Sequence, residues 1–248
     1  RGIGVRIVAD KSQTPPGRHS QSLVVRKALV DTGRVKTLAD IKGLRVATAA
    51  VGSSAMGTLE RLYRLGGFSA KDIEKVTLNV PQQIAALQNG AIDAAFPTEP
   101  VGTMVVRQGV AVRLSTDADL YPGHQIAVIY FSGKLRNERP QVARAFMRAY
   151  LRGVRAQNAS IIDGKIAGRD ADEFVSLITE HTPLKDRELA RAVTMSFCDD
   201  DGMPNVASLK EDFDIFRREG LLEGNVEAED AVDLSIVREA ARDLAARR

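Results

Sequence analysis

The chain of 248 residues contains a single cysteine, Cys198, no tryptophan, and only 5% aromatic residues. One cysteine excludes an internal disulfide and any metal site built from several thiolates. No apolar run approaches the roughly 20 residues that a membrane-spanning helix needs. The scarcity of aromatic side chains leaves few surfaces for stacking, which disfavours a large aromatic heterocycle as a ligand.

The charges are nearly balanced, with 35 basic and 32 acidic side chains and a net charge of +3. They are mixed along the chain, and no basic tract is interleaved with aromatic residues, so nucleic-acid binding is not expected. A hydrophobic content of 44% supports one large or two ordinary globular domains. The chain begins with arginine and shows no export signal, so we expect it to start inside a longer gene product.

The central stretch alternates short apolar runs with short helical patterns. Strands are expected over residues 45–50, 75–80 and 92–96. A helix is expected after Gly52, and a shorter one is expected to start at Pro81. A strand–helix–strand series with short loops indicates a parallel sheet, and such sheets bind ligands at the carboxyl ends of their strands.

The flanking regions differ in character. Before the centre we expect a strand over 5–9, a loop over 11–20 and a strand over 21–27; after it we expect a helix over 101–108 and strands over 110–115 and 124–131. Helices are expected over 137–156, 171–180, 186–197, 209–219 and 230–246. The first of these carries an apolar seam formed by Val142, Phe146, Tyr150 and Val154. The segments 21–27 and 124–131 bracket the strand–helix units, as two strand crossings between a pair of lobes would.

Four segments resemble, in this order, one known family. They are VKTLADIKGLRVATAAVGSSAM (35–56), PQQIAALQNGAIDAAFPTEP (81–100), IAVIYFSGKLRNERPQVARAFMRAYLRG (126–153), and the tail FRREGLLEG with VDLSIVREA (216–224 and 232–240). The family is the nitrate/sulfonate/taurine type of ABC-transporter substrate-binding protein, which also includes binders of thiamine and riboflavin precursors. Each motif alone is weakly specific, and their order and spacing carry the resemblance.

The resemblance implies an α/β fold of the type II periplasmic-binding-protein kind, with two α/β lobes, two strand crossings and a helical C-terminal region. Residues 1–24 would be a remnant of lobe I and the first crossing, 25–122 lobe II, and 123–248 the second crossing and the return to lobe I. Family members carry an earlier ALxxGxxD segment, whereas this chain has one, at 86–93. We therefore expect that the family's N-terminal portion precedes the first residue given.

The first candidate binding segment is Gly52-Ser53-Ser54, at a predicted strand-to-helix turn. Such a turn presents backbone N–H groups, two hydroxyls and the positive end of a helix dipole, which suit a carboxylate, sulfonate or phosphate oxygen. The alternative is that Ser53 only caps its helix. The resemblance favours ligand contact, because family members place this turn at the cleft.

The other two strand ends carry Gln83, Thr98 and Glu99. The carboxylate of Glu99 can accept hydrogen bonds from a ligand amine or ring N–H, but it would repel a simple anion. Together with the serine turn it favours a ligand that has an acidic or polar group and a separate donor. The alternative for Glu99 is a cap on the following helix, and the alternative for Gln83 is a role at a helix start.

Ser12 and Gln13 follow the first predicted strand, and the resemblance implies that this loop lines the cleft from the opposite lobe. His124 can polarise a ligand, but a structural role is favoured for a lone histidine, and no second histidine stands at metal-ligand spacing. The run from Asp199 to Gly202 lacks the spacing of a calcium loop. No metal site and no cofactor are predicted.

The resemblance implies a solute-binding component of an ABC importer, periplasmic or lipid-anchored at the cell surface, monomeric, with a membrane permease as partner. Its ligand would be a small polar or anionic organic solute. Two alternatives remain: an enzyme on the same fold, of the thiamine-pyrimidine or menaquinone-precursor type, or the ligand-sensing domain of a regulator. The sequence lacks the Cys- and His-rich iron motif of the thiamine-pyrimidine enzymes, which disfavours that alternative.

Overall fold

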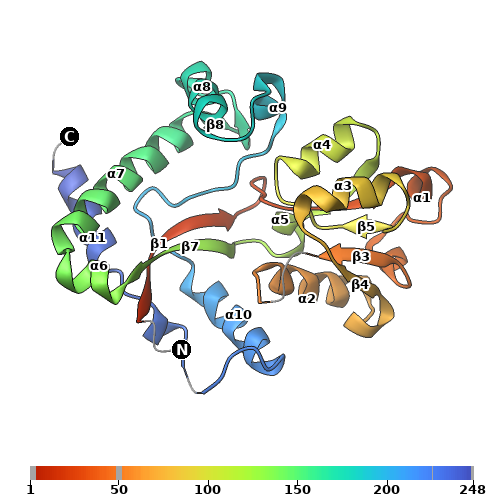
Figure 1. Cartoon of the computed structure of the whole chain (residues 1–248), viewed down its shortest axis with the longest axis horizontal. Helices are drawn as coiled ribbons and strands as arrows, with labels where there is room; N and C mark the ends of the chain where they lie inside the picture. The colour runs from red at the N-terminus through yellow and green to blue at the C-terminus, as the bar shows by residue number, and fades with distance from the viewer. Residues whose placement is uncertain (1–3, 49–51, 225, 247–248) are drawn as a thin grey trace.

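A mixed five-stranded sheet forms one part of the molecule (Figure 1). The computed structural model describes residues 4–48, 52–224 and 226–246. The strand order is β4 (Glu74–Thr77), β3 (Arg45–Thr48), β5 (Ala94–Ala95), β2 (Ser22–Arg26) and β6 (Ala111–Thr116). Strands β4, β3 and β5 are parallel, as the sequence predicts, but β2 runs antiparallel to both of its neighbours. The predicted continuation of β3 to residue 50 lies outside the described residues.

Helices cover both faces of this sheet, because its strands are apolar on both sides. They are α1 (Lys27–Asp31), α2 (Ala55–Gly66), α3 (Val80–Gln88), α4 (Val101–Arg107) and α5 (Asp117–Leu120). One apolar cluster includes Val46 and Leu62 of α2, and a second, formed on other strand residues, includes Ala47 and Leu87 of α3. Neighbouring residues of β3 thus serve opposite faces, which is the period of two that a buried strand requires.

A ribbon of two long antiparallel strands leads away from the sheet lobe (Figure 1). It pairs β1 (Val5–Thr14) with β7 (His124–Ser132). Two expectations are wrong here. The strand continues through residues 11–14, where a loop was expected, and the segment 21–27 contains β2 of the sheet and is not a crossing. The crossing strands are β1 and β7. The predicted domain boundaries at residues 24 and 122 stay a prediction.

At the far end of the ribbon lie α6 (Gly133–Glu138), α7 (Pro140–Ala159) and α11 (Ser235–Ala245). The core-facing stripe of α7 contains Ala143, Met147 and Leu151, which pack with Val8, Ala9 and Val237. Val154, one helical turn further on, is also buried. The predicted seam is therefore wrong over most of its length, because the buried stripe is shifted by one residue toward the C-terminus. Val142 and Phe146 of the predicted seam are 45% and 49% exposed. The buried stripe thus packs against side chains of both β1 and α11.

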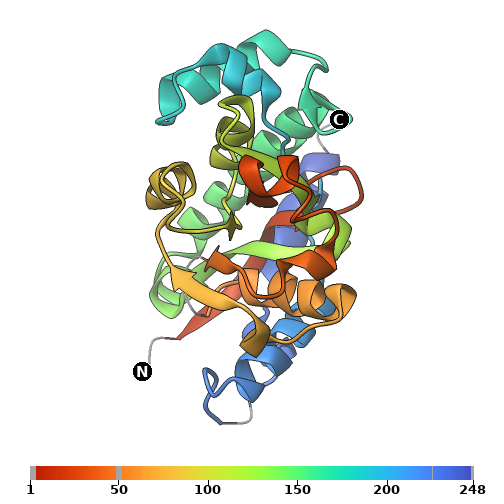
Figure 2. The ribbon, with the colours of Figure 1, turned by 90° about the vertical axis from the view of Figure 1, so that its right-hand side faces the viewer.

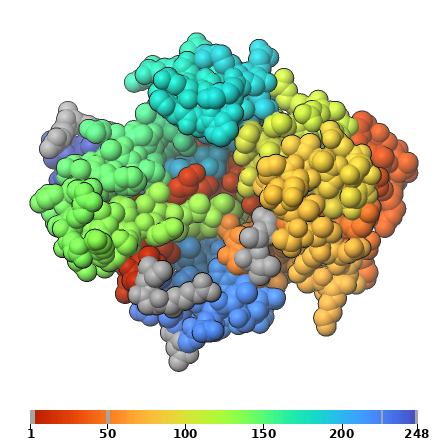
Figure 3. All heavy atoms as spheres, in the orientation of Figure 1, coloured from red at the N-terminus to blue at the C-terminus, as the bar shows by residue number. Residues whose placement is uncertain are grey.

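Two further units flank the ribbon on opposite sides, as Figures 1 and 2 show. The first, the α8–α9 unit, contains the hairpin β8 (Ile161–Ile162) and β9 (Lys165–Ile166), α8 (Ala171–His181) and α9 (Arg187–Ala192), which ends five residues before its predicted end. The second is α10 (Val206–Arg218). The 3-10 turn at Glu229–Ala231 precedes α11. The surface is hollowed between these parts, with the ribbon exposed at the bottom of the hollow (Figure 3).

Candidate functional site

The predicted binding segments emerge at one edge of the sheet. Strands β3 and β5 are adjacent and parallel, with Ala47 opposite Ala95, so their carboxyl ends lie side by side. Strand β2 runs the other way, which brings its amino end to the same edge: the Glu99 N–H donates to the Ser20 carbonyl oxygen at 2.9 Å. This edge faces the ribbon and the two flanking units.

The serine turn begins with Gly52, whose φ of 79° is in the left-handed region that favours glycine. Helix α2 has Ser54 as its N-cap, and among the described residues the Ser54 side chain makes no capping hydrogen bond. Gly52 and Ser54 line a cavity of about 150 Å³ with Gln125, Asp212 and apolar residues of α10. The turn therefore lies at a hollow, and its contact with a ligand stays a prediction.

Gln83 lies in the first turn of α3, which begins at Val80, one residue before the predicted start. Asn79 caps this helix, because its Oδ1 accepts a hydrogen bond from the Gln82 N–H at 3.0 Å. The Gln83 side chain is fully buried, and its Nε2 donates to the Leu78 carbonyl at 3.1 Å. Its Oε1 has no hydrogen-bond partner among the described residues.

Glu99 is surrounded by donors from its own chain. Its Oε1 lies 3.2 Å from His19 Nε2 and accepts a hydrogen bond from Arg113 Nη2 at 3.1 Å. Its Oε2 accepts from the Thr103 N–H at 3.0 Å, in the first turn of α4, so the capping alternative is supported. Burial alone would raise the pKa of Glu99. Hydrogen bonds from His19 and Thr103, with the charge of Arg113, outweigh burial and lower the pKa.

Asp117 organises the loop beside Glu99. Its carboxylate accepts hydrogen bonds from the Ser20 and Gln21 N–H groups, and Gln21 forms an isolated bridge with Thr98. Burial raises the pKa of Asp117 to about 6, although these bonds oppose the shift. Thr98 is thus held beside the amino end of β2, where its backbone is part of the sheet edge.

Ser12 and Gln13 lie within β1. Ser12 is 2% exposed, and its Oγ has no hydrogen-bond partner in the described part of the chain. Gln13 Nε2 donates to the Met203 carbonyl at 2.9 Å, and its backbone pairs with Phe197. Both residues thus sit in the ribbon beside the C-terminal segment, and their contact with a ligand stays a prediction.

The largest cavity near the predicted residues, which we call the α4–α9 cavity, has a volume of about 610 Å³. Strand β1 supplies Lys11, and the sheet lobe with the segment that joins it to β1 supplies His19, Ser20, Glu99, Pro100 and Met104. The α8–α9 unit and the chain that follows it supply the opposite wall, including Ile178, Leu184, Val193 and Met195. Glu99 therefore lies at a cavity of ligand size. Gly52 and Ser54 line the separate smaller hollow.

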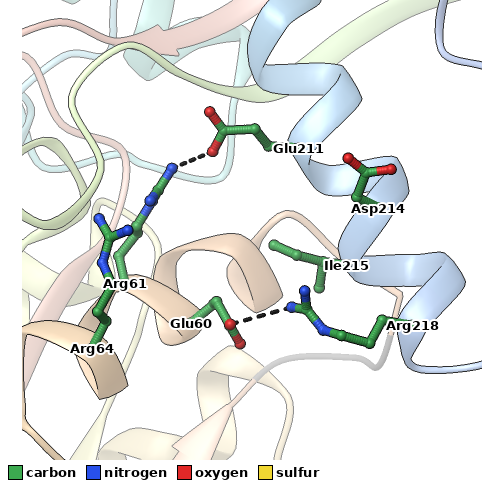
Figure 4. A pocket seen from close by; sticks show the side chains of 7 residues that line it. All are labelled: Glu60, Arg61, Arg64, Glu211, Asp214, Ile215 and Arg218. Atoms are coloured by element: carbon green, nitrogen blue, oxygen red, sulfur yellow. Dashed lines mark hydrogen bonds and ion pairs between the residues drawn. The ribbon is translucent and has the colours of Figure 1, made fainter.

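On the other side of the ribbon, α2 and α10 enclose a charged hollow of about 240 Å³ (Figure 4). Ion pairs join Arg61 with Glu211 and Arg218 with Glu60. Behind them, His124 is fully buried, with its Nε2 3.0 Å from Asp212 Oδ2. The structural interpretation of His124 therefore agrees with this geometry.

Sequence reasoning missed Arg113 and the pairing of His19 with Glu99. Arg113 lies between Val112 and Leu114 in β6, and its guanidinium also donates to Ser22 Oγ at 2.9 Å. A lone cation inside an apolar strand was the available signal, because a half-buried charge needs a partner. The partner, fourteen residues away in Glu99, was not identifiable from spacing.

This arrangement, in which paired antiparallel strands join two lobes, is the fold that solved binding components of ABC importers share with this chain. The chain belongs to the NMT1-like family, whose model matches residues 12–165. The suspected family and the two-lobed α/β fold are thereby confirmed. The second lobe consists mainly of helices. Among the described residues, the strands outside the five-stranded sheet are those of the ribbon and of one short hairpin.

Solved structures share this fold over nearly the whole chain. The ligand-binding component of an ABC-type import system from Staphylococcus aureus, crystallised with zinc, has a TM-score of 0.76 and 18% identity, covering 97% of this chain and 76% of that one. The periplasmic nitrate-binding protein NrtA from Synechocystis PCC 6803 has a TM-score of 0.75 and 16% identity, covering 98% and 68%. At these identities the likeness shows the fold alone.

A curated relative is the nitrate import ATP-binding protein NrtC of Synechocystis sp. strain PCC 6803, 28% identical over 145 residues. The match covers 54% of this chain and 21% of the relative, so the chain spans about a fifth of that protein's length. A desulfurization enzyme, DSZB, also shares the fold, with a TM-score of 0.64 and 15% identity over 98% of this chain and 80% of that one. Binding proteins and an enzyme thus both use this architecture.

Within residues 4–48, 52–224 and 226–246, no helix has the length and apolar character needed to cross a membrane. Within the same ranges, histidine, cysteine and acidic side chains nowhere gather in a group of three or more that would suit a metal ion.

Proposed function

We propose that the protein is the solute-binding component of an ABC importer and captures a small polar or anionic organic solute between its two lobes. The observation that carries the proposal is the α4–α9 cavity, of about 610 Å³, at the carboxyl end of β5. It lies where an open α/β sheet offers its ligand site, and its far wall belongs to a different part of the molecule.

Each predicted residue has a role in this proposal. The turn of Gly52, Ser53 and Ser54 holds the acidic group of the solute through N–H groups and hydroxyls. Gln83, Thr98 and Glu99 orient the remainder, and Ser12 and Gln13 approach from the ribbon. The Glu99 carboxylate accepts from three donors of the chain, which leaves about one of its roughly four acceptor positions for a solute.

Binding of this kind requires no bond to be broken. A solute that touches both walls of the cleft stabilises the closed arrangement over the open one, and closure presents a new surface to a permease. The strands β1 and β7 are the connections across which the lobes would rotate. The protein would act outside the cytoplasm, in the periplasm or anchored by lipid at the cell surface, as a monomer.

The enzyme alternative has little chemical support in the described chain. The one thiol, Cys198, is 5% exposed, and burial raises its pKa to about 11. Its Sγ lies 2.6 Å from the Lys11 carbonyl oxygen, inside the ribbon. A protonated, enclosed thiol is a poor nucleophile. The desulfurization enzyme is only 15% identical, so its shared fold carries no argument for the same activity here.

A thermal-shift screen of the protein against nitrate, sulfonates, aromatic acids and vitamin precursors tests the proposal. A solute that binds only the folded state stabilises it by roughly 2.7 kcal/mol at a hundredfold excess over Kd. Replacing Ser53 and Ser54 with alanine should abolish this stabilisation. Ser176→Ala, on α8, is the matched control and should leave it intact. No stabilisation by any solute, or stabilisation indifferent to the two serines, contradicts the proposal.

A further inference from the structure

Arg18 connects the two walls of the α4–α9 cavity. Its Nε donates to the Met195 carbonyl oxygen at 2.8 Å, and its Nη2 donates to the Ser196 carbonyl oxygen at 2.9 Å. Met195 and Ser196 line the far wall, on the side of the α8–α9 unit. His19 and Ser20, which follow Arg18 directly in the chain, line the near wall, on the side of the sheet lobe. One side chain thus joins the two walls across 177 residues of sequence.

The sequence before Arg18 fixes the backbone from which its side chain extends. Pro15, Pro16, Gly17 and Arg18 form a β-turn, closed by a hydrogen bond from the Arg18 N–H to the Pro15 carbonyl oxygen at 3.0 Å. Gly17 has a φ of 80°, as the third position of a type II turn requires, and proline is common at the second position. The guanidinium therefore reaches the far wall from a rigid base.

The two carbonyl oxygens are the hydrogen-bond partners of a half-buried cation. Within the described part of the chain, Arg18 forms no ion pair, and its guanidinium lies 5.7 Å from the ring centre of Phe197, the residue after Ser196. Burial of a charge without hydrogen-bond partners is costly, and a planar guanidinium presents paired donors that an ammonium group does not. The contact therefore depends on the geometry of arginine and not only on its charge.

The turn before Arg18 also receives the β8–β9 hairpin of the α8–α9 unit. Gly164 has a φ of 76°, and a Cβ atom at this position would lie 2.7 Å from the Gly17 carbonyl oxygen and 2.9 Å from Thr194 Cγ2. The Gly164 carbonyl oxygen accepts a hydrogen bond from the Met195 N–H at 2.8 Å. Turn, hairpin and far wall thus meet at a point that has no room for a further methyl group.

We infer, resting on the proposed function, that Arg18 is a positioning residue for solute binding. It acts through Met195 and Ser196 and not by contact with the solute. By holding their backbone against the turn, Arg18 keeps the far wall where the cavity has its volume of about 610 Å³. If the far wall takes this position only part of the time, the apparent Kd rises in inverse proportion to that fraction.

Hydrogen exchange followed by mass spectrometry tests the positioning without a solute. The N–H groups of Met195 and Phe197 donate to backbone carbonyl oxygens at 2.8 and 3.2 Å, so their exchange reports on the far wall. Arg18→Met removes both guanidinium bonds and should speed this exchange about tenfold. Exchange in α7, which lies outside the cavity, should stay as in the wild type.

Titration calorimetry tests the consequence for binding, with sodium nitrate, sodium methanesulfonate and sodium benzoate, or with another solute that the thermal-shift screen identifies. For a solute that binds the wild type, Arg18→Met should raise the Kd about tenfold. Arg18→Lys keeps the charge but loses the paired donors, so its Kd should lie between the two. Gly164→Ala forces the hairpin away from the turn and should raise the Kd by a similar factor while Arg18 is retained.

Two controls separate positioning from a loss of stability. Arg191→Met removes a guanidinium of α9 that donates to the Ile166 carbonyl oxygen within the α8–α9 unit, and it should leave both the exchange and the Kd unchanged. Met147 is fully buried in the core beside the ribbon, so Met147→Ala should lower the Tm at least as far as Arg18→Met does. Its Kd should nevertheless stay within about twofold of the wild type.

The outcomes separate the inference from the function on which it rests. Unchanged exchange or an unchanged Kd in Arg18→Met overturns the inference and leaves the proposed function standing. A Kd that rises equally in Met147→Ala shows a general effect of stability and also overturns the inference. If Arg18→Met does not fold, Arg18→Lys and Gly164→Ala decide by the same two measurements. If no solute of the thermal-shift screen binds the wild type, the proposed function fails and the inference fails with it.

Discussion

The sheet lobe meets the rest of the molecule on two sides of the ribbon, and the two contacts have opposite chemistry. On one side, α2 and α10 are joined by Arg61–Glu211 and Glu60–Arg218 across a charged hollow (Figure 4). On the other side, α4 and the α8–α9 unit enclose a larger cavity with an apolar wall. The direct polar contact there includes a long hydrogen bond, 3.4 Å, from Arg107 to the Glu188 carbonyl.

The difference indicates that the two contacts have different roles, one structural and one suited to binding a guest. Ion pairs need defined geometry, so the α2–α10 contact fixes how the lobes lie when it is closed. An apolar cavity makes few directional demands and gains by covering apolar surface, so the α4–α9 side is suited to a guest. The following changes test how strongly groups on each of the two sides contribute to stability.

The buried pair should give the largest effect. His124 and Asp212 have side chains 0% and 6% exposed, so Asp212→Ala leaves the buried His124 Nε2 without its partner, whereas Nδ1 keeps Thr58 Oγ1 at 3.3 Å. We expect a loss of about 3 to 5 kcal/mol in the free energy of unfolding. Urea denaturation measures it, with Asp214→Ala as the control on the same helix, 68% exposed in its side chain and expected to cost less than ~0.5 kcal/mol. Equal losses would contradict the structural role.

The second effect is on the cavity side and depends on pH. Burial raises the pKa of Asp117 to about 6, so the folded state keeps this proton at a pH where the unfolded chain has lost it. Stability therefore falls as the pH rises through this window. Between about pH 4.5 and about pH 7.5, the free energy of unfolding of the wild type should fall by about 2 kcal/mol relative to that of Asp117→Asn. Unfolding titrations of both proteins measure it, and a difference that is constant with pH would refute the shift.

The partly exposed pair comes third. Arg61 pairs with Glu211, and its guanidinium lies 4.4 Å from the ring centre of Tyr121. Arg61→Ala should lower the free energy of unfolding by about 1 kcal/mol. High salt should make this difference smaller, because it screens the ion pair in the wild type. Arg64 lines the same hollow and makes no ion pair in the part of the chain that the structure describes. Arg64→Ala is therefore the matched control, and it should lower the free energy of unfolding by less than ~0.5 kcal/mol. If the two losses are equal, the pairing contributes nothing.

The smallest effect should come from the outer pair. Glu60 and Arg218 are separated by 3.2 Å and have side chains 50% and 55% exposed. Glu60→Gln should change the free energy of unfolding by less than ~0.5 kcal/mol, because water already solvates both charges. A loss as large as that of Arg61→Ala would show that the two exposed pairs act as one network.

Parts of the candidate site were predictable because local chemistry specifies them. Gly52 has the positive φ that its turn requires, and Glu99 caps α4 as one of its two interpretations proposed. The sequence did not predict that donors of the chain occupy most acceptor positions of the Glu99 carboxylate. His19 and Arg113 reach this carboxylate from positions 80 and 14 residues away. The α4–α9 cavity was not predictable for the same reason, because its two walls come from distant parts of the chain.

Helix α7 shows the same limit within one element. Its sequence carries two neighbouring apolar stripes, and periodicity alone favoured the one with Val142 and Phe146. The structure buries the stripe with Met147 and Leu151. A helix pattern gives the presence of an apolar face, but packing against β1 and α11 decides which face is covered.

The sequence by itself determined the strand–helix series, the two-lobed class and the family, because periodicity, turn residues and motif order are local properties that survive without coordinates. The tertiary structure decided that β1 pairs with β7, that β2 runs antiparallel inside the sheet, and that an apolar cavity forms on one side of the ribbon. These outcomes depend on contacts between segments far apart in the sequence, such as Val24 with Ala95 and Asp10 with Val128. No local pattern encodes a pairing at that separation, so only the folded chain shows it.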